Sequence, residues 1–232
     1  MEATIPTINT YHLTRSFLEA MVLEVESPTL FWVKLKNGQD ELNELLDYLT
    51  MRMKRIGTKL TMAPDRIHVG TLVAVKEGRR WQRGIITEVT SHTDVTIHLK
   101  DWGRKIHRRK FDCCHLENRF REQPWQAIPC GAHGIRPVSP TGWTERDIIL
   151  TKALIEKEWG EIKIRRASGG EFAEVDFSTH RPDDFRRHDL AHALEQAGAA
   201  LRSSNVIINH IIGPNNVIER PEFRKIRSPG SL

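Results

Sequence analysis

Two histidines at helical spacing are the feature of this sequence that most resembles a metal site. His188 and His192 stand four residues apart, so one face of a helix would carry both imidazoles, which suits zinc. A hydrolytic zinc motif of this kind needs a glutamate beside the first histidine, but Asp189 stands there and no third ligand is evident. We therefore expect a polar helix face, with no metal and no cofactor.

The acidic residues of the first predicted hairpin do not form a catalytic cluster. Metal-dependent cleavage of a phosphodiester needs grouped carboxylates for the cation and arginines for the phosphate. Glu24 and Glu26 are followed instead by apolar residues and lysines. We expect no catalytic residue and a non-enzymatic protein.

Three cysteines offer a second possible metal site. The segment 113–115 reads Cys-Cys-His, and Cys130 and His133 follow at some distance. Neighbouring side chains point to opposite faces of a strand, which favours buried thiols over a zinc site that uses both Cys113 and Cys114. Three is also an odd number, which does not suit a disulfide framework. We expect buried thiols in a reducing compartment.

A dense cationic run, 104–110, could bind nucleic acid. It contains Arg104, Lys105, His107, Arg108, Arg109 and Lys110. Barrels of the oligonucleotide-binding kind hold single strands with such charges and with stacking aromatic rings. The alternative is a solvated edge strand, where basic side chains deter aggregation. The net charge of +5, from 35 Lys and Arg against 30 Asp and Glu, permits RNA as a partner without requiring it.

Length and composition exclude several classes of protein. The chain has 232 residues, of which 39% are hydrophobic and 28% charged, which is enough for a real core and excludes disorder throughout. No apolar stretch approaches the roughly 20 residues that cross a bilayer. Residues 1–10 show no signal or transit peptide. We expect no membrane association and a cytosolic or nuclear protein.

The N-terminal half alternates strands with one helix. Strand-like runs at 23–25 and 30–35 flank Ser27-Pro28 and predict a hairpin. Apolar residues at helical spacing predict an amphipathic helix over 39–56. Short strands are then predicted at 71–76, 82–89, 95–100 and 105–109. The segment 67–116 is expected to hold five short strands in all, and their spacing indicates a small antiparallel barrel, with Trp81 pointing into its core.

The C-terminal half begins with a segment rich in glycine and proline. A helix is predicted from Thr144, where Thr144 and Asp147 resemble a capping box. Strands follow at 161–165 and 171–177, and a helix from Leu190 to Leu201. The chain after Ser203 is expected to be loop-like.

Four motifs in order resemble an extended Tudor domain. They are Val69–Val75, Arg80–Gly84, Val95–Gly103 and Trp125–Cys130. The resemblance implies a mainly β protein with helices (α+β), in which a five-stranded Tudor barrel is inserted into a split oligonucleotide-binding-type barrel like that of staphylococcal nuclease. It divides the chain into 1–38 and 124–205 for the split barrel, 39–57 for the connecting helix, 58–123 for the Tudor barrel, and a tail, 206–232.

The same resemblance implies a partner and a location. Extended Tudor domains bind the arginine-rich N-terminal tails of PIWI-type Argonautes, often with symmetric dimethylarginine, in the piRNA pathway. A cytoplasmic, perinuclear germ granule (nuage) follows as the expected location, and other scaffold proteins as further possible partners.

The aromatic cage that such a domain uses is degenerate in this sequence. Carried over residue by residue, its positions fall at Val75 or Lys76, Gln82, Leu99, Trp102 and, for the amide, Arg104. Only Trp102 is aromatic, and it ends a strand before Gly103, where we expect an exposed side chain. One exposed cation–π contact contributes about 0.5–1 kcal/mol. We therefore predict arginine recognition that does not depend on methylation.

A basic chain that binds a basic peptide needs local acidic groups. The candidates for an acidic groove are Glu24, Glu26, Asp101, Glu171, Glu174 and Asp176. Solvated strand faces are the alternative interpretation.

Overall fold

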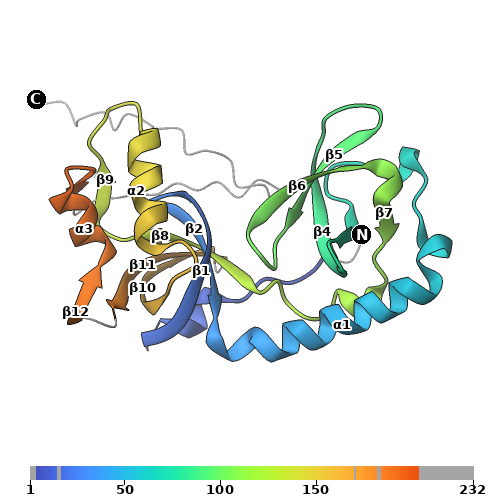
Figure 1. Ribbon diagram of the computed structural model, residues 1–232, viewed down its shortest axis with the longest axis horizontal. Helices are drawn as coiled ribbons and strands as arrows, with labels where there is room; N and C mark the ends of the chain where they lie inside the picture. Colours follow the sequence, from blue (N-terminus) through green and yellow to red (C-terminus); the bar gives the residue numbers. More distant parts are fainter. Residues whose placement is uncertain (1–3, 15–16, 170, 182–183, 204–232) are drawn as a thin grey trace, which may run out of the picture.

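Two β barrels and a helix that spans both make up the molecule (Figure 1). The computed structural model describes residues 4–14, 17–169, 171–181 and 184–203. The predicted tail, 206–232, lies outside these residues. In the part of the chain so described, no helix is long and apolar enough to cross a membrane.

The first barrel is assembled from both halves of the chain. Its strands are β1 (Phe17–Ser27), β2 (Leu30–Leu35), β8 (Ala127–Ala132), β10 (Trp159–Ser168) and β11 (Phe172–Arg181), with β12 (Asp184–Asp189) added beside β11. The order is β10-β1-β2-β8-β11, and pairing of β10 with β11 closes the ring. Closure removes the unpaired strand edges of an open sheet. Val22, Phe31, Ile128 and Val175 are among its core residues.

The second barrel is continuous in sequence. It contains β3 (Leu72–Glu77), β4 (Arg80–Val89), β5 (Asp94–Leu99), β6 (Arg104–Arg109) and β7 (Cys113–His115) in the antiparallel order β6-β5-β4-β3-β7. Its core includes Val73, Ile86 and Ile97. All of the cationic run except Lys110 therefore falls on an edge strand, β6, with alternating exposure, and Lys110 begins the 3-10 turn that follows.

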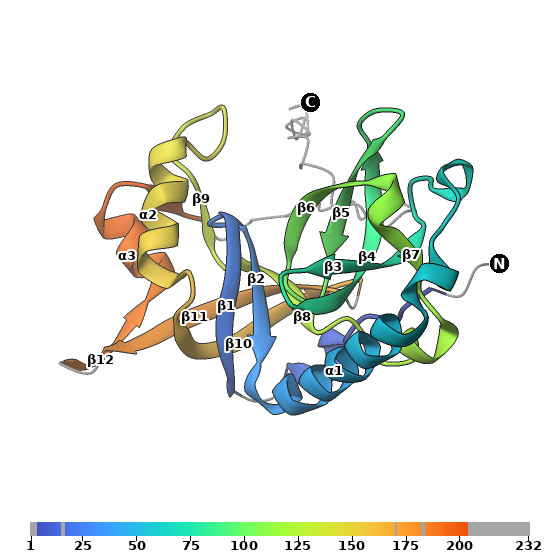
Figure 2. The same ribbon diagram turned by 45° about the vertical axis from the view of Figure 1, so that its right-hand side comes forward.

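Helix α1 (Gln39–Ile56) connects the two barrels along one side of the molecule (Figure 2). Its buried stripe consists of Leu42, Leu46, Leu49 and Met53. These side chains pack on the outer face of the second barrel, where Ala74 and Ile85 lie. Each fully buried leucine contributes about 1.5–3 kcal/mol, so the stripe attaches the helix firmly to the sheet.

Two helices cover one end of the first barrel. Helix α2 (Glu145–Ile155) begins with the predicted capping box, since Thr144 and Asp147 each accept the other's backbone N–H. Helix α3 (Leu190–Gln196) is shorter than expected, because Gly198 turns the chain with φ +68°. Leu201 instead lies in β13 (Ala200–Arg202), which pairs with β9 (Ile135–Pro137).

The prediction that His188 and His192 share one helix face was wrong, because α3 begins only at Leu190. His188 lies in strand β12, and Asp189 caps the helix by accepting the backbone N–H of His192 at 2.7 Å. The two imidazoles therefore do not share a helix face.

Short 3-10 turns complete the chain. They are η1 (Thr10–Leu13), η2 (Lys36–Gly38), η3 (Gly57–Leu60), η4 (Pro64–Arg66), η5 (Lys110–Asp112) and η6 (Asn118–Phe120).

The adjacent cysteines occupy opposite faces of β7, as predicted. Cys113 joins the barrel core and Cys114 faces α1. Burial raises the pKa of Cys113 to about 12.

Candidate functional site

The turn between β5 and β6 places Trp102 at the junction of the two barrels. Gly103 has φ +70°, and its Cα packs so closely that a Cβ would lie 2.1 Å from Cγ of Trp32. Trp102 contacts the small cluster formed by Leu23, Trp32 and Ala127 of the first barrel. The indole is half-buried, so the expectation of an exposed side chain was wrong.

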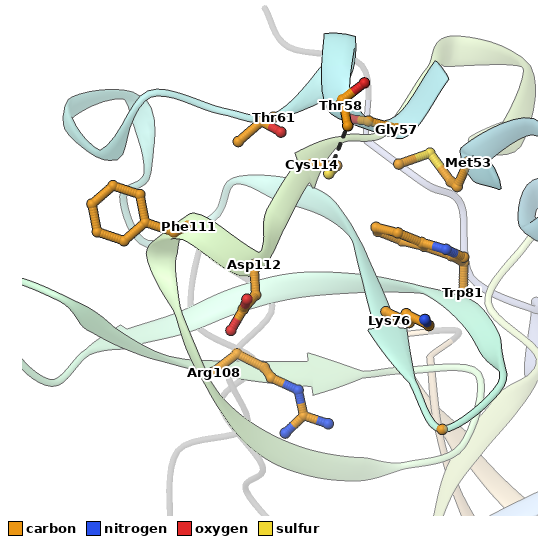
Figure 3. Close-up of a pocket in the computed structure, with 11 residues that line it drawn as sticks. Met53, Gly57, Thr58, Thr61, Lys76, Trp81, Arg108, Phe111, Asp112 and Cys114 are labelled. Carbon is orange, nitrogen blue, oxygen red and sulfur yellow. Dashed lines mark hydrogen bonds between the residues drawn. The ribbon is translucent and has the colours of Figure 1, made fainter. Parts of the chain in front are cut away.

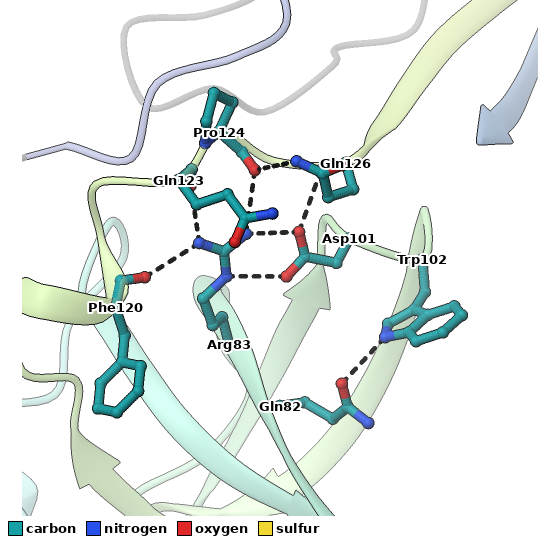
Figure 4. Close-up of polar contacts among 8 residues, drawn as sticks. All are labelled: Gln82, Arg83, Asp101, Trp102, Phe120, Gln123, Pro124 and Gln126. Carbon is teal, nitrogen blue, oxygen red and sulfur yellow. Dashed lines mark hydrogen bonds and ion pairs between the residues drawn. The ribbon is translucent and has the colours of Figure 1, made fainter. Parts of the chain in front are cut away.

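The indole N–H and the ring face of Trp102 both have partners within the chain. Nε1 donates to Oε1 of Gln82 at 2.9 Å (Figure 4). Nζ of Lys34, on β2, lies 5.1 Å from the ring centroid, within cation–π range. Lys34 is 4% exposed, and burial lowers its pKa, while Asp101 raises it. Lys34 was not predicted as a site residue, because its only signal is a lysine within an otherwise apolar strand.

The remaining cage positions do not form a binding surface. Val75 and Leu99 are fully buried in the core of the second barrel, so their assignment as peptide contacts is corrected. Their alternation along the strands turns them inward together with the other core residues. Lys76, the alternative to Val75, is exposed. Arg104 forms an ion pair with Glu77 at 2.6 Å.

Arg83 and Asp101 form a fully buried ion pair beside this junction (Figure 4). Nε and Nη2 of Arg83 donate to the two carboxylate oxygens at 2.9 and 2.7 Å. The other donors reach three backbone carbonyl oxygens, those of Phe120, Gln123 and Pro124. All five guanidinium N–H groups are thus used. Asp101 is enclosed and neutralised, so it cannot belong to a peptide-binding groove.

The other predicted acidic residues are dispersed. Glu174 is also buried, where it contacts His133 and Arg166, so it is removed from the groove as well. Asp176 pairs with Arg165 at 2.5 Å.

Besides Asp176, three predicted acidic residues retain exposed area. Glu24 lies 3.9 Å from Lys152. Glu26 is exposed and accepts the indole N–H of Trp32 at 3.4 Å. Glu171 is partly exposed. Glu26 and Glu171 are thus the acidic candidates without an ion pair among the described residues.

Trp81 lies on the outer face of the second barrel, not in its core. It pairs in register with Lys76 and packs against Met53 and Gly57 of the α1 end. Trp81 does point opposite to Gln82, as expected, but it is Gln82 that lies on the inward face of the sheet with Val75, its partner in register. The prediction was wrong because α1 supplies an apolar partner outside the barrel.

A buried histidine beside the turn gives a testable pH dependence. His98 stacks edge-on against Trp32 at 4.9 Å, and Nε2 has no hydrogen-bond partner among the described residues. Burial, helped by Lys100 and Lys105, lowers the pKa of His98 to about 3. Between pH 6.5 and about 3, His98 is therefore protonated in the unfolded chain and neutral in the folded chain.

Stability should accordingly fall as pH decreases from 6.5 toward 3, by up to about 1.4 kcal/mol per pH unit from this group. His98→Gln, which cannot titrate, should remove that part of the slope in urea unfolding series. An unchanged slope in the variant would contradict a neutral, buried His98.

Comparison with known protein sequences decides the family. The sequence profile of the Tudor domain matches residues 13–134, more than half of the chain. This chain belongs to the Tudor domain family. Tudor domain-containing protein 5 of Canis lupus familiaris is 28% identical over 158 residues, and Tudor domain-containing protein 6 of Mus musculus is 26% identical over 162.

Those alignments cover 65% and 68% of this Tudor chain but 15% and 7% of the two relatives. The chain thus spans a small part of the length of the curated proteins that it matches.

Solved structures extend the match to the first barrel. The extended Tudor domain of human TDRD1, in complex with a symmetrically dimethylated peptide, superposes with a TM-score of 0.74 at 20% identity, covering 87% of this chain and 96% of that one. A variant of the Drosophila melanogaster Papi extended Tudor domain, in complex with an unmethylated Piwi N-terminal peptide, gives 0.67 at 20% identity, covering 81% and 99%. The predicted fold of a Tudor barrel within a split barrel is confirmed.

Proposed function

We propose that this extended Tudor domain is a non-enzymatic adaptor that binds an arginine-rich peptide, such as the N-terminal tail of a PIWI-type Argonaute, without requiring arginine methylation. The observation that carries the proposal is the Lys34 ammonium over the Trp102 ring. A dimethylarginine would have to displace this internal cation to reach the single indole. The structural relatives support a peptide ligand, since one of them holds a dimethylated peptide and another an unmethylated one.

Unmethylated arginine suits the groups that remain accessible. A free guanidinium offers five N–H donors, and methylation removes some of them while the charge remains. Carboxylates take such donors in charge-assisted hydrogen bonds. Glu26 and Glu171 are the acidic candidates that retain exposed area and have no ion pair among the described residues. Recognition through hydrogen bonds and charge should therefore replace the contribution of an aromatic cage.

Paired peptides test the proposal directly. Calorimetry with one arginine-rich peptide in unmethylated and symmetrically dimethylated forms should give dissociation constants within about threefold, because one occupied ring contributes at most about 0.5–1 kcal/mol. A tenfold preference for the methylated peptide would overturn the proposal.

Lys34→Ala provides a gain-of-preference variant. Removing the internal cation exposes the indole face, so affinity for the dimethylated peptide should rise by about two- to fivefold relative to the unmethylated one. Lys36→Ala, at an exposed lysine that directly follows β2 and pairs with Glu19, is the matched control and should leave the ratio unchanged.

The cellular setting follows the same proposal. An adaptor for Argonaute tails in the piRNA pathway would act in a cytoplasmic, perinuclear germ granule, where other scaffold proteins are further partners. Imaging of the tagged protein in germ cells, with and without Argonaute, tests this placement.

A further inference from the structure

An open pocket of about 620 Å³ lies on the outer side of the Tudor barrel (Figure 3). The end of α1 and the turn after it form one wall, the β3–β4 hairpin a second, and β6 with η5 and β7 a third. Trp102, Gln82 and Lys34 do not line it. It is therefore separate from the degenerate cage.

The apolar part of the pocket offers aromatic surface to a ligand. Trp81 lies beside Met53, and Phe111 stands at the opposite edge (Figure 3). Phe111 is 61% exposed, which is unusual for a phenylalanine and gives its ring little packing role in the isolated domain. Flat rings of this kind bind nucleobases by stacking, which is tolerant of sequence because every base has a π face.

The polar part of the pocket carries charged groups that form no ion pair in the described part of the chain. Lys76 and Arg108 form no ion pair with a carboxylate there, and Arg108 donates only to the backbone oxygen of His107. Asp112 likewise has no ion-pair partner among those residues. Two cations suit a phosphate, and a carboxylate suits the amino group of a base.

Positive charge continues beyond the pocket in several directions. Lys59, Arg79 and Lys110 each neighbour a lining residue in sequence. A single acidic side chain of a peptide would use only the two cations inside. Consecutive phosphates of a single strand would use those outside as well, so charge complementarity favours a nucleic acid.

We propose that this pocket, built around Trp81, Phe111, Lys76 and Arg108, binds a nucleotide of single-stranded RNA. Phe111 and Trp81 contact the base, the two cations contact phosphate, and Asp112 accepts a hydrogen bond from the base edge. The proposal relocates the nucleic-acid contact from the whole cationic run to one end of it, since Arg104 is engaged by Glu77.

Fluorescence anisotropy with labelled oligouridylate and oligoadenylate, using the full chain, tests the pocket. Phe111→Ala should weaken RNA binding by about 5- to 100-fold. Arg108→Ala should weaken it and lower the slope of log affinity against log salt by about 0.7. Arg136→Ala, an exposed arginine on β9 of the other barrel, is the charge-matched control and should change neither quantity.

Several outcomes would overturn the proposal. They are no RNA binding by the unaltered chain, equal affinity in the Phe111→Ala variant, or equal weakening by Arg108→Ala and Arg136→Ala, which would indicate general charge attraction. Binding of a labelled peptide of alternating aspartate and phenylalanine, lost in Phe111→Ala while RNA does not bind, would assign the pocket to a protein partner.

The arginine-peptide assay separates this site from the cage. Phe111→Ala should leave the affinity for the arginine-rich peptide unchanged, whether or not that peptide discriminates methylation. Phe111 is exposed and Arg108 partly exposed, and unfolding curves equal to that of the unaltered chain would establish that both variants fold.

Discussion

Replacing Arg83 with alanine should lower the free energy of unfolding by about 3–5 kcal/mol, because the change leaves the carboxylate of Asp101 buried without its charge partner. Arg83 and Asp101 are 0% and 1% exposed in their side chains. The guanidinium also satisfies the carbonyl oxygens of Phe120, Gln123 and Pro124. That segment leads from the Tudor barrel back to β8, so the loss should loosen the junction between the barrels as well.

Urea unfolding measures this effect, and two further variants make it specific. Arg83→Lys should recover only part of the loss, because an ammonium has three donors and cannot form the two-point contact with Asp101. Arg79→Ala removes an exposed arginine in the neighbouring turn and should change stability by less than about 0.5 kcal/mol. If Arg83→Ala unfolded at the same urea concentration as Arg79→Ala, the ion pair would not support the junction.

Gly103→Ala should be the second most damaging of the changes considered. Its φ of +70° disfavours any Cβ, and the added carbon would lie 2.1 Å from Cγ and 2.3 Å from Cβ of Trp32. Left-handed strain costs about 1–2 kcal/mol and overpacking about 1–3 kcal/mol more. The turn that carries Trp102 must therefore move, so the Trp102 contact with Lys34 should be lost together with about 2–5 kcal/mol of stability.

A second glycine separates the two causes. Gly198 has φ +68°, but no heavy atom lies within 4 Å of the position that an added Cβ would take. Gly198→Ala should therefore show the backbone strain alone, about 1–2 kcal/mol. Thermal or urea unfolding of both variants gives the comparison, and tryptophan fluorescence should change only in Gly103→Ala. Equal losses in the two variants would mean that contact with Trp32 is unimportant.

Elements with a strong period of their own could be predicted from the sequence. The apolar spacing of 39–56 predicted a helix whose observed bounds are Gln39–Ile56. Strand β5 was equally clear, because it alternates strictly. Strand β8 was not predicted, since Pro129 and Gly131 favour a loop when the segment is viewed alone. It becomes a strand because β2 and β11 lie on either side of it.

The candidate site could be predicted only as a set of residue types. The motif positions identified Trp102 and the absence of the other aromatic side chains of the cage, because residue types can be read directly from the sequence. They could not show that Val75 and Leu99 are enclosed, or that Asp101 is neutralised by Arg83. Polar residues are usually exposed, so the sequence pattern does not predict that Asp101, Glu174 and Lys34 are buried.

By itself, the sequence determined the family, the helix and strands with regular patterns, and the replacement of a ring of aromatic side chains by one indole. The tertiary structure alone decided that Lys34 lies over that indole, that Trp81 faces outward across a pocket from Phe111, and that Glu26 and Glu171 keep accessible area without an ion-pair partner among the described residues. The physical reason is that each of these features depends on segments far apart in the chain. Those segments come together through barrel closure and helix packing, which the local periodicity of apolar residues does not predict.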